Sequence, residues 1–188
     1  MFKGKGKLLI GMFLPILLFG LAQLGVASVP KNAAQSGLTQ KSTGLADKVR
    51  HELVMLPYYG VFDNLAFSIE GSDTVVLTGQ VTRPVLKSDA GAVVRKVEGV
   101  GKVVNNIEVL PLSPFDDSIR LAAYRAIFSK PGFERYAIQA LSPIRIIVKN
   151  GNITLDGVVS SQMDKIMAEM AARSVPGSFG VTNNLAVA

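Results

Sequence analysis

VVLTGQV at residues 75–81 decides the fold, because a close copy of this stretch, ITLDGVV, returns at residues 153–159. Gly79 in the first stretch corresponds to Gly157 in the second, 78 residues later. The same offset relates the sequences that follow the two stretches, and no gap is needed to align them. A fixed internal spacing of this kind indicates one small structural unit that is used twice.

Length and charge limit the classes of protein to which the chain can belong. Its 188 residues divide into units of roughly 65 to 70 residues, near the lower limit for a self-sufficient core. The net charge is +6, but from Ser28 onward 17 basic residues stand against 14 acidic ones, a balance of +3. This charge is too small to predict nucleic-acid binding. It permits contact with an anionic membrane surface.

Residues that carry chemistry are scarce. The chain has no cysteine and a single histidine, His51, which excludes disulfides, thiolate metal sites and most imidazole-based sites. Asp116 and Asp117 stand at a predicted helix start, where negative charge favours the helix dipole. Asp73 and Asp156 lack the repeated ligands of a calcium loop. We therefore expect no cofactor, no metal and no enzymatic activity, which would need a deep pocket with converging titratable groups.

The N-terminal segment, residues 1–27, has the features of a signal peptide. Lysines at positions 3, 5 and 7 precede an apolar run, and small residues at 25–28 provide a cleavage site. The run is shorter than the ~20 residues that a spanning helix needs. An uncleaved inner-membrane anchor and a buried core helix remain open as alternatives. Residues 28–44 are small and polar and predict a flexible linker. Because of the leader, we expect an exported protein.

The first copy, residues 45–112, has the sequence pattern of α-β-β-α-β. The predicted elements are a helix that ends before Pro57, a hairpin with strands over 65–69 and 75–81, a helix from Pro84 and a strand over 103–109. The strands alternate apolar and polar residues, and the helices have apolar residues at a spacing of three to four.

The second copy, residues 113–188, repeats this order. Ser113 and Pro114 predict a helix start, and Asn-Gly-Asn at 150–152 predicts a tight hairpin turn. The predicted buried face of its second helix consists of Met163, Ile166, Met167, Met170 and Ala171. The sequence thus predicts an α+β fold with two modules, each a three-stranded mixed sheet with two helices on one face.

The two copies differ between the first helix and the first strand. The distance from Asp47 to Gly79 is 32 positions, whereas that from Asp117 to Gly157 is 40. The additional residues lie within 129–143 and predict an extra helical turn through Tyr136, Ile138 and Leu141. We expect this insertion to be the most individual surface of the protein.

Both copies resemble the BON domain (bacterial OsmY and nodulation). The resemblance rests on VVLTGQV with VEGVGKVVNNIEV, and on ITLDGVV with VPGSFGVTNNLAV, and covers about residues 45–188. Two such domains behind a signal peptide are similar to periplasmic tandem-BON proteins. The second copy departs from the pattern at Ser178 and Phe179, where the first has Val100 and Gly101.

The resemblance implies binding to phospholipid or to envelope proteins, and in some members a role in osmotic or envelope stress or a chaperone-like activity. It supplies no catalytic motif. We expect an exported envelope protein that contacts anionic phospholipid, envelope proteins or both. The alternatives are a periplasmic chaperone or adaptor that binds polypeptide without lipid, and a structural module that self-associates.

The residues of the repeated motif itself are expected to be structural. Gly79 and Gly157 within strands indicate a bulge or a closely packed helix backbone, with ligand approach as the alternative. Gly99 and Gly177 follow helices, where a left-handed conformation favours glycine. The amides of the Asn pairs that end in Asn106 and Asn184 are expected to satisfy loose backbone groups.

Two sets of side chains are candidates for contact with a membrane or partner. The aromatic set is Tyr58, Tyr59, Phe62, Phe133 and Tyr136, whose rings suit an interface but equally suit a plug for the open end of a small core. The basic set is Arg83, Lys87, Arg95, Lys96 and Lys102 in the first copy and Arg120, Arg125, Lys130 and Arg135 in the second. Solvated helix surface is the alternative for the basic set.

Overall fold

The computed structural model describes residues 44–188. The predicted signal peptide, and the predicted linker except for its last residue, lie outside this range. Gly44 is the first residue of a helix over 44–54. This helix buries Leu45, Val49 and Leu53 at helical spacing, and it ends three residues before Pro57.

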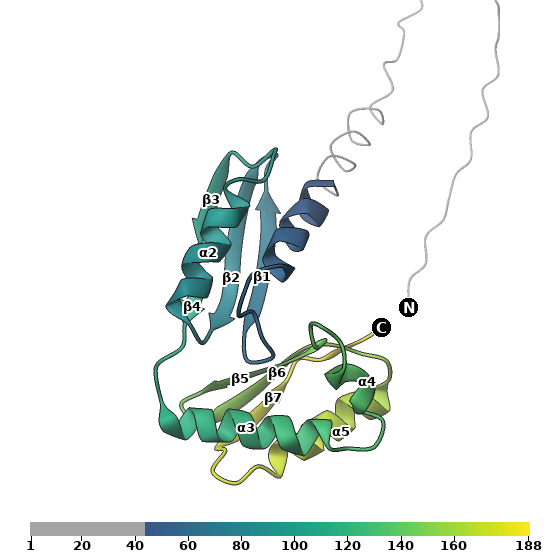
Figure 1. Ribbon diagram of the computed structural model, residues 1–188. Helices are drawn as coiled ribbons and strands as arrows, with labels where there is room; N and C mark the ends of the chain where they lie inside the picture. The colour runs from purple at the N-terminus through teal and green to yellow at the C-terminus, as the bar shows by residue number, and fades with distance from the viewer. Residues whose placement is uncertain (1–43) are drawn as a thin grey trace, which may run out of the picture.

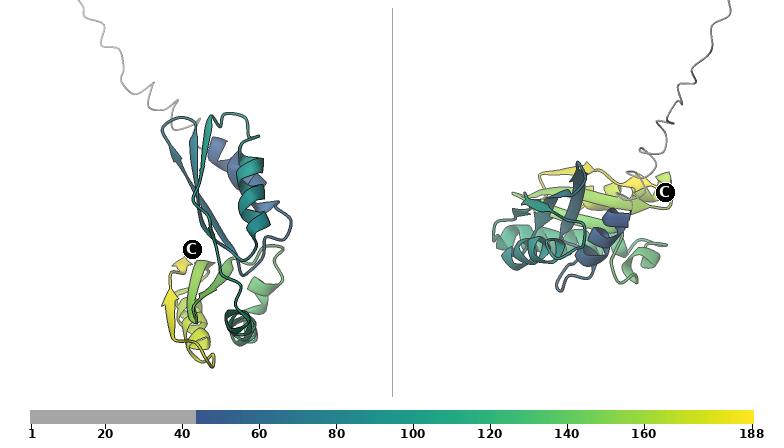
Figure 2. Two further views of the ribbon diagram at one scale, coloured as in Figure 1. Left: turned by 90° about the vertical axis from the view of Figure 1, so that its left-hand side faces the viewer. Right: turned by 90° about the horizontal axis from the view of Figure 1, so that it is seen from above.

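The first module builds one sheet with both helices on the same face (Figures 1 and 2). Its further elements are β1 (Asn64–Glu70), β2 (Thr74–Val81), α2 (Pro84–Val94), β3 (Lys102–Asn105) and β4 (Glu108–Val109). The strand β2 is central: β1 pairs with it antiparallel, and β3 and β4 both pair with it in parallel. The expected third strand is therefore present, divided into two short pieces.

The second module repeats this arrangement. Its elements are α3 (Pro114–Phe128), α4 (Glu134–Ala137), β5 (Ile144–Lys149), β6 (Asn152–Val159), α5 (Gln162–Arg173), β7 (Gly180–Asn183) and β8 (Ala186–Val187). The sheet order β5-β6-β7 matches β1-β2-β3, with β8 also on β6. The predicted α+β fold of two repeated modules is confirmed.

Local signals mark the element boundaries as the sequence predicts. The Ser113 hydroxyl accepts a hydrogen bond from the Asp116 amide at 3.1 Å and caps α3. Asn150 and Gly151, with φ of 51° and 75°, form the two-residue turn between β5 and β6. The extra helical turn expected in the insertion is present as α4 and contains Tyr136, but it ends at Ala137, so the prediction was wrong for Ile138 and Leu141, which lie beyond the helix.

An asparagine in each module divides the third strand. The Asn105 amide nitrogen donates to the Lys87 carbonyl at 2.7 Å, and its oxygen accepts from the Ile107 amide at 3.2 Å. Asn183 makes the equivalent bonds to Lys165 at 3.0 Å and to Leu185 at 3.2 Å. Each side chain therefore joins a helix to the sheet. In each Asn pair this role belongs to the first member, whereas the second members, Asn106 and Asn184, are exposed.

The strand glycines are needed because the neighbouring strand approaches closely. Gly79 and Gly157 have φ of 112° and 120°, which L residues rarely adopt. A Cβ at Gly79 would lie 2.0 Å from the Asn64 carbonyl oxygen, and one at Gly157 would lie 1.9 Å from the Pro143 oxygen. The close neighbour is thus the backbone at the start of the paired strand, Asn64 in β1 or Pro143 just before β5, and not a helix backbone. Gly99 and Gly177 also have positive φ, at 95° and 83°.

The prediction for the buried face of α5 was wrong in part. The residues that face the sheet are Ala168, Ala171 and Ala172, with Met167 half-buried. The side chains of Met163, Ile166 and Met170 point outward and are 64%, 44% and 66% exposed. Small side chains allow the helix to approach the sheet closely, so the alanines and not the larger residues form the contact.

Candidate binding surfaces

Aromatic residues of the insertion belong to the core of the second module. Phe133 is fully buried and Tyr136 is 3% exposed, and their rings pack edge to face at 5.4 Å. The Tyr136 hydroxyl accepts from the Ser160 amide at 2.9 Å and donates to the Asp164 carboxylate at 2.9 Å. Burial therefore removes Phe133 and Tyr136 from the surface available for contact, and they plug the core instead.

Asp164 is the charged centre of this buried network. Its carboxylate accepts hydrogen bonds from Ser161 at 2.8 Å and from Arg135 at 2.7 Å, besides that from Tyr136. Burial by itself raises the pKa of Asp164, but the hydrogen bonds from Ser161 and Tyr136 and the charge of Arg135 outweigh burial and hold this pKa below its usual value. Arg135, a predicted contact residue, thus pairs with Asp164 and stacks over the Tyr136 ring at 4.9 Å.

We expect the second module to lose stability in acid through this carboxylate. Because the folded state holds the pKa of Asp164 below the unfolded value of about 3.9, its contribution is fully present above that value and is lost as pH falls through the folded pKa. Urea unfolding at pH 6 and pH 3 should show a smaller pH-dependent loss for Asp164→Asn than for the parent chain. Glu134→Gln, at an exposed carboxylate, is the control, and an equal loss for both variants would contradict the prediction.

The aromatic loop of the first module is shaped by a buried aspartate. Asp63 accepts hydrogen bonds from the Thr82 amide at 2.7 Å and from the Gly60 amide at 3.1 Å. These bonds fold the loop back against the end of β2. The loop projects toward the second module at the lower end of the first sheet (Figure 1).

Contacts between the modules gather on this loop. The Arg145 guanidinium lies 4.5 Å from the centre of the Tyr59 ring and donates to the Gly60 carbonyl at 2.9 Å. The Ile146 amide donates to the Val61 carbonyl at 2.8 Å. Val61 and Phe62 pack against the core of the second module. Tyr59 and Phe62 therefore serve the interface between the modules.

The basic candidates of the first module do not form one cluster. Arg83 precedes α2 and stacks over the exposed ring of Tyr58 at 5.0 Å. Arg95 and Lys96 follow the other end of α2, whose 11 residues place them about 16 Å away. The remaining two candidates are Lys87 within α2 and Lys102 at the start of β3. Contact with a single membrane patch through all five stays a prediction.

An apolar stripe on α5, made by Met163, Ile166 and Met170, is a surface feature that the sequence prediction missed. The three residues are spaced three and four apart and share the outer face of the helix. The alanines at 168, 171 and 172 are the signal that identifies the opposite face as the buried one.

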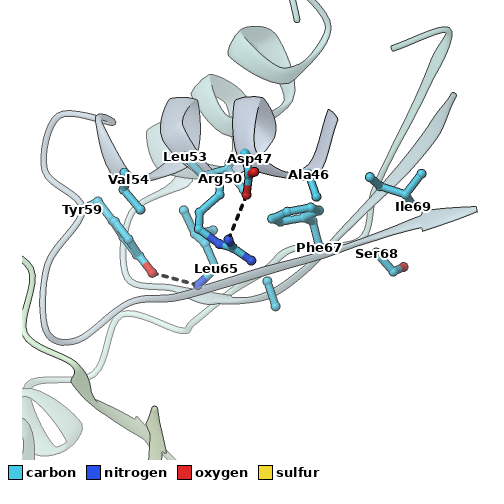
Figure 3. Close-up of a pocket in the computed structure, with 11 residues that line it drawn as sticks. Ala46, Asp47, Arg50, Leu53, Val54, Tyr59, Leu65, Phe67, Ser68 and Ile69 are labelled. Carbon is cyan, nitrogen blue, oxygen red and sulfur yellow. Dashed lines mark hydrogen bonds and ion pairs between the residues drawn. The ribbon is translucent and has the colours of Figure 1, made fainter. Parts of the chain in front are cut away.

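A groove in the first module lies between the helix over 44–54 and the strand β1 (Figure 3). Its volume is about 760 Å³. Its lining residues are Ala46, Asp47, Arg50, Leu53, Val54, Tyr59, Leu65, Ala66, Phe67, Ser68 and Ile69. Tyr59 closes one end, where its hydroxyl accepts a hydrogen bond from the Leu65 amide at 3.3 Å.

Neither a metal site nor a membrane-spanning helix is found in the part of the chain that the structure describes. Residues 44–188 hold no cluster of three or more histidine, cysteine, aspartate or glutamate side chains arranged for a metal ion. Within the same range no helix is both long and apolar enough to cross a bilayer.

Comparisons with known proteins give a family and distant structural likenesses. No curated protein matches the chain. One similar structure is the C-terminal domain of CdsD, the structural protein of the type III secretion system of Chlamydia trachomatis, with 13% identity and a TM-score of 0.28 over 77% of this chain and 97% of that chain. A second CdsD structure gives 13% identity and a TM-score of 0.29 over 77% of this chain and 93% of that chain.

The family profile of the BON domain matches residues 42–111 and 133–188, which is more than half of the chain. The second match begins at Phe133, after α3. Both matches include the central strand and the parallel strands that pair with it. The chain therefore belongs to the BON-domain family and contains two copies of the domain.

Proposed function

We propose that this protein is a non-enzymatic component of the cell envelope that binds the surface of an anionic phospholipid membrane through the helical face of its second module. The observation that carries the proposal is the apolar stripe of Met163, Ile166 and Met170 on the outer face of α5. An amphipathic helix that lies in the interface presents apolar side chains of this kind to the lipid.

The charge distribution favours the second module as the membrane-facing one. Residues 113–188 hold eight basic and six acidic side chains, a balance of +2, whereas residues 45–112 hold seven and eight, a balance of −1. Arg125 and Arg173 lie in the last turns of α3 and α5. A basic side chain near an anionic leaflet contributes about 1 kcal/mol to binding.

The arrangement of the modules leaves this face open. The first module contacts the second through the loop that carries Tyr59 and Val61, on the side of β5. The helices α3 and α5 cover the far side of that sheet (Figures 1 and 2). Membrane contact at α5 therefore does not require the modules to separate.

Flotation with lipid vesicles tests the proposal. We expect the chain from Ser28 to float with vesicles that contain phosphatidylglycerol, and less with phosphatidylcholine alone. Replacing the three stripe residues with serine should weaken the partition at least about tenfold, since each side chain loses roughly 1 kcal/mol or more of apolar burial.

The matched control replaces three exposed apolar residues elsewhere, Met55, Leu112 and Ile138, with serine. This control should float like the parent chain. Equal flotation of the stripe variant and the control, or no flotation with either lipid, would overturn the proposal.

A further inference from the structure

The outer edge of β5 in the second module is covered by neighbouring groups. The Ile144 amide donates to the Ser142 hydroxyl at 3.3 Å, and the Ile146 amide donates to the Val61 carbonyl of the first module at 2.8 Å. At the other end, the buried Arg120 donates to the Val148 carbonyl at 2.7 Å. Each of the three residues that face away from β6 thus has at least one backbone group in a hydrogen bond, and an edge strand covered in this way is protected from pairing with another chain.

The corresponding edge of β1 in the first module has one such partner. Leu65 pairs with Gly79 in the first module, and Ile144 pairs with Gly157 in the second, so these two residues are equivalent. Two residues further along each strand, Phe67 is therefore equivalent to Ile146, the residue that contacts the loop at Val61. The Leu65 amide donates to the Tyr59 hydroxyl and therefore points away from β2. The alternation of an antiparallel pair turns the amides of Phe67 and Ile69 to the same outer edge.

No other group covers this edge within residues 44–188. Among them, none accepts a hydrogen bond from the outward amides of Phe67 and Ile69. The side chains of Leu65, Phe67 and Ile69 are half-buried, whereas their counterparts on β5 are completely buried. The shorter first helix and the absence of an insertion leave the groove of Figure 3 above them.

The groove also contains Arg50, which is the counterpart in the first module of Arg120 in the second. Arg50 pairs with Asp47 at 3.4 Å, as Arg120 pairs with Asp117 one module later. Arg120 uses a second nitrogen for a strand carbonyl, whereas the side chain of Arg50 is 65% exposed. Its guanidinium points from the helix toward β1 in Figure 3. Arg50 is therefore placed to donate to a backbone carbonyl at this edge.

We propose that the groove binds an extended polypeptide segment of another protein, which adds as a strand to the free edge of β1 and places alternate apolar side chains on Leu53, Phe67 and Ile69. The kind of occupant is inferred from the second module, where the backbone of a loop of the first module covers the equivalent edge. There Val61 supplies the backbone acceptor, and Val61 and Phe62 supply the apolar contacts. The backbone amides at every second residue of an edge strand can donate to the carbonyl groups of an added strand. These main-chain hydrogen bonds give affinity that does not depend on the sequence of the bound peptide.

This site is separate from the α5 stripe and does not depend on membrane binding. The test uses a fluorescent peptide of alternating valine and threonine with a terminal lysine, together with the chain from Ser28. Amide hydrogen exchange on adding the peptide should slow at Phe67 and Ile69. It should not change at Ala66 and Ser68, whose amides already face β2.

Two methylated peptides provide the matched control. One carries N-methyl groups on the valine amides and the other on the threonine amides, so that each blocks one edge of the added strand. One of the two should bind about tenfold more weakly for each hydrogen bond lost, while the other binds like the parent peptide. Equal binding of both methylated peptides would overturn the proposal.

Two further results would replace the polypeptide partner with another occupant and overturn the proposal. Slower exchange at Phe67 and Ile69 that depends on protein concentration without peptide would identify a second copy of this chain. The same change caused by vesicles alone, without peptide, would identify lipid.

Discussion

Replacing Gly157 with alanine is expected to destabilise the second module by about 3–5 kcal/mol, one of the largest effects available to a single methyl group in this chain. Its φ of 120° is unfavourable for an L residue, and the added Cβ would meet the Pro143 carbonyl oxygen at 1.9 Å. Pro143 directly precedes β5, whose first residue, Ile144, pairs with Gly157, so relief requires the start of β5 to move away from β6. Urea unfolding followed by circular dichroism measures the loss, and amide exchange assigns it to the module.

The control for this prediction is Gly71→Ala in the hairpin turn of the first module. Gly71 also has a positive φ, 67°, but an added Cβ there has no neighbour within 4 Å. This variant should lose only about 1–2 kcal/mol, the cost of the left-handed conformation itself. A loss at Gly157 no greater than that at Gly71 would show that the strands relax around the methyl group.

Replacing Phe133 with alanine is expected to cost about 3–5 kcal/mol, because a completely buried ring leaves a cavity in the second core. The ring contacts Tyr136 and lies in the same cluster as Ile146 and Leu155. Chemical unfolding measures the loss. The result separates the two interpretations of the insertion, since a contact residue would alter binding without altering stability.

Ile138→Ala is the control within the same insertion. Ile138 is 82% exposed, so its loss should change the free energy of unfolding by no more than about 0.5 kcal/mol. If Phe133→Ala changed vesicle flotation and left stability intact, the core assignment of the ring would fail.

Local patterns in the sequence were sufficient for the modules and their elements. The cap at Ser113 and the turn at Asn150 each depend on residues that are close in the chain, and the repeat of Gly79 at Gly157 is read directly from the sequence. Such signals depend little on the rest of the fold, because they reflect backbone geometry and hydrogen bonds within a few residues. For that reason the element order was predicted correctly from the sequence.

The surfaces were predicted less well, because burial depends on partners far away in sequence. Met163, Ile166 and Met170 were expected inside because they are more apolar than the alanines that in fact face the sheet. Phe133 and Tyr136 were left open between core and contact. Neither hydrophobicity nor spacing distinguishes these cases, since the distance between helix and sheet decides which side chains fit.

By itself the sequence determined that one α-β-β-α-β unit occurs twice, with a glycine at the same strand position of each copy. The tertiary structure alone decided that the two copies are used differently. The loop with Val61 covers the edge of β5, and the equivalent edge at Phe67 stays open beside a groove. The physical reason is that an edge strand is satisfied by whatever backbone reaches it, and that backbone comes from a distant part of the chain.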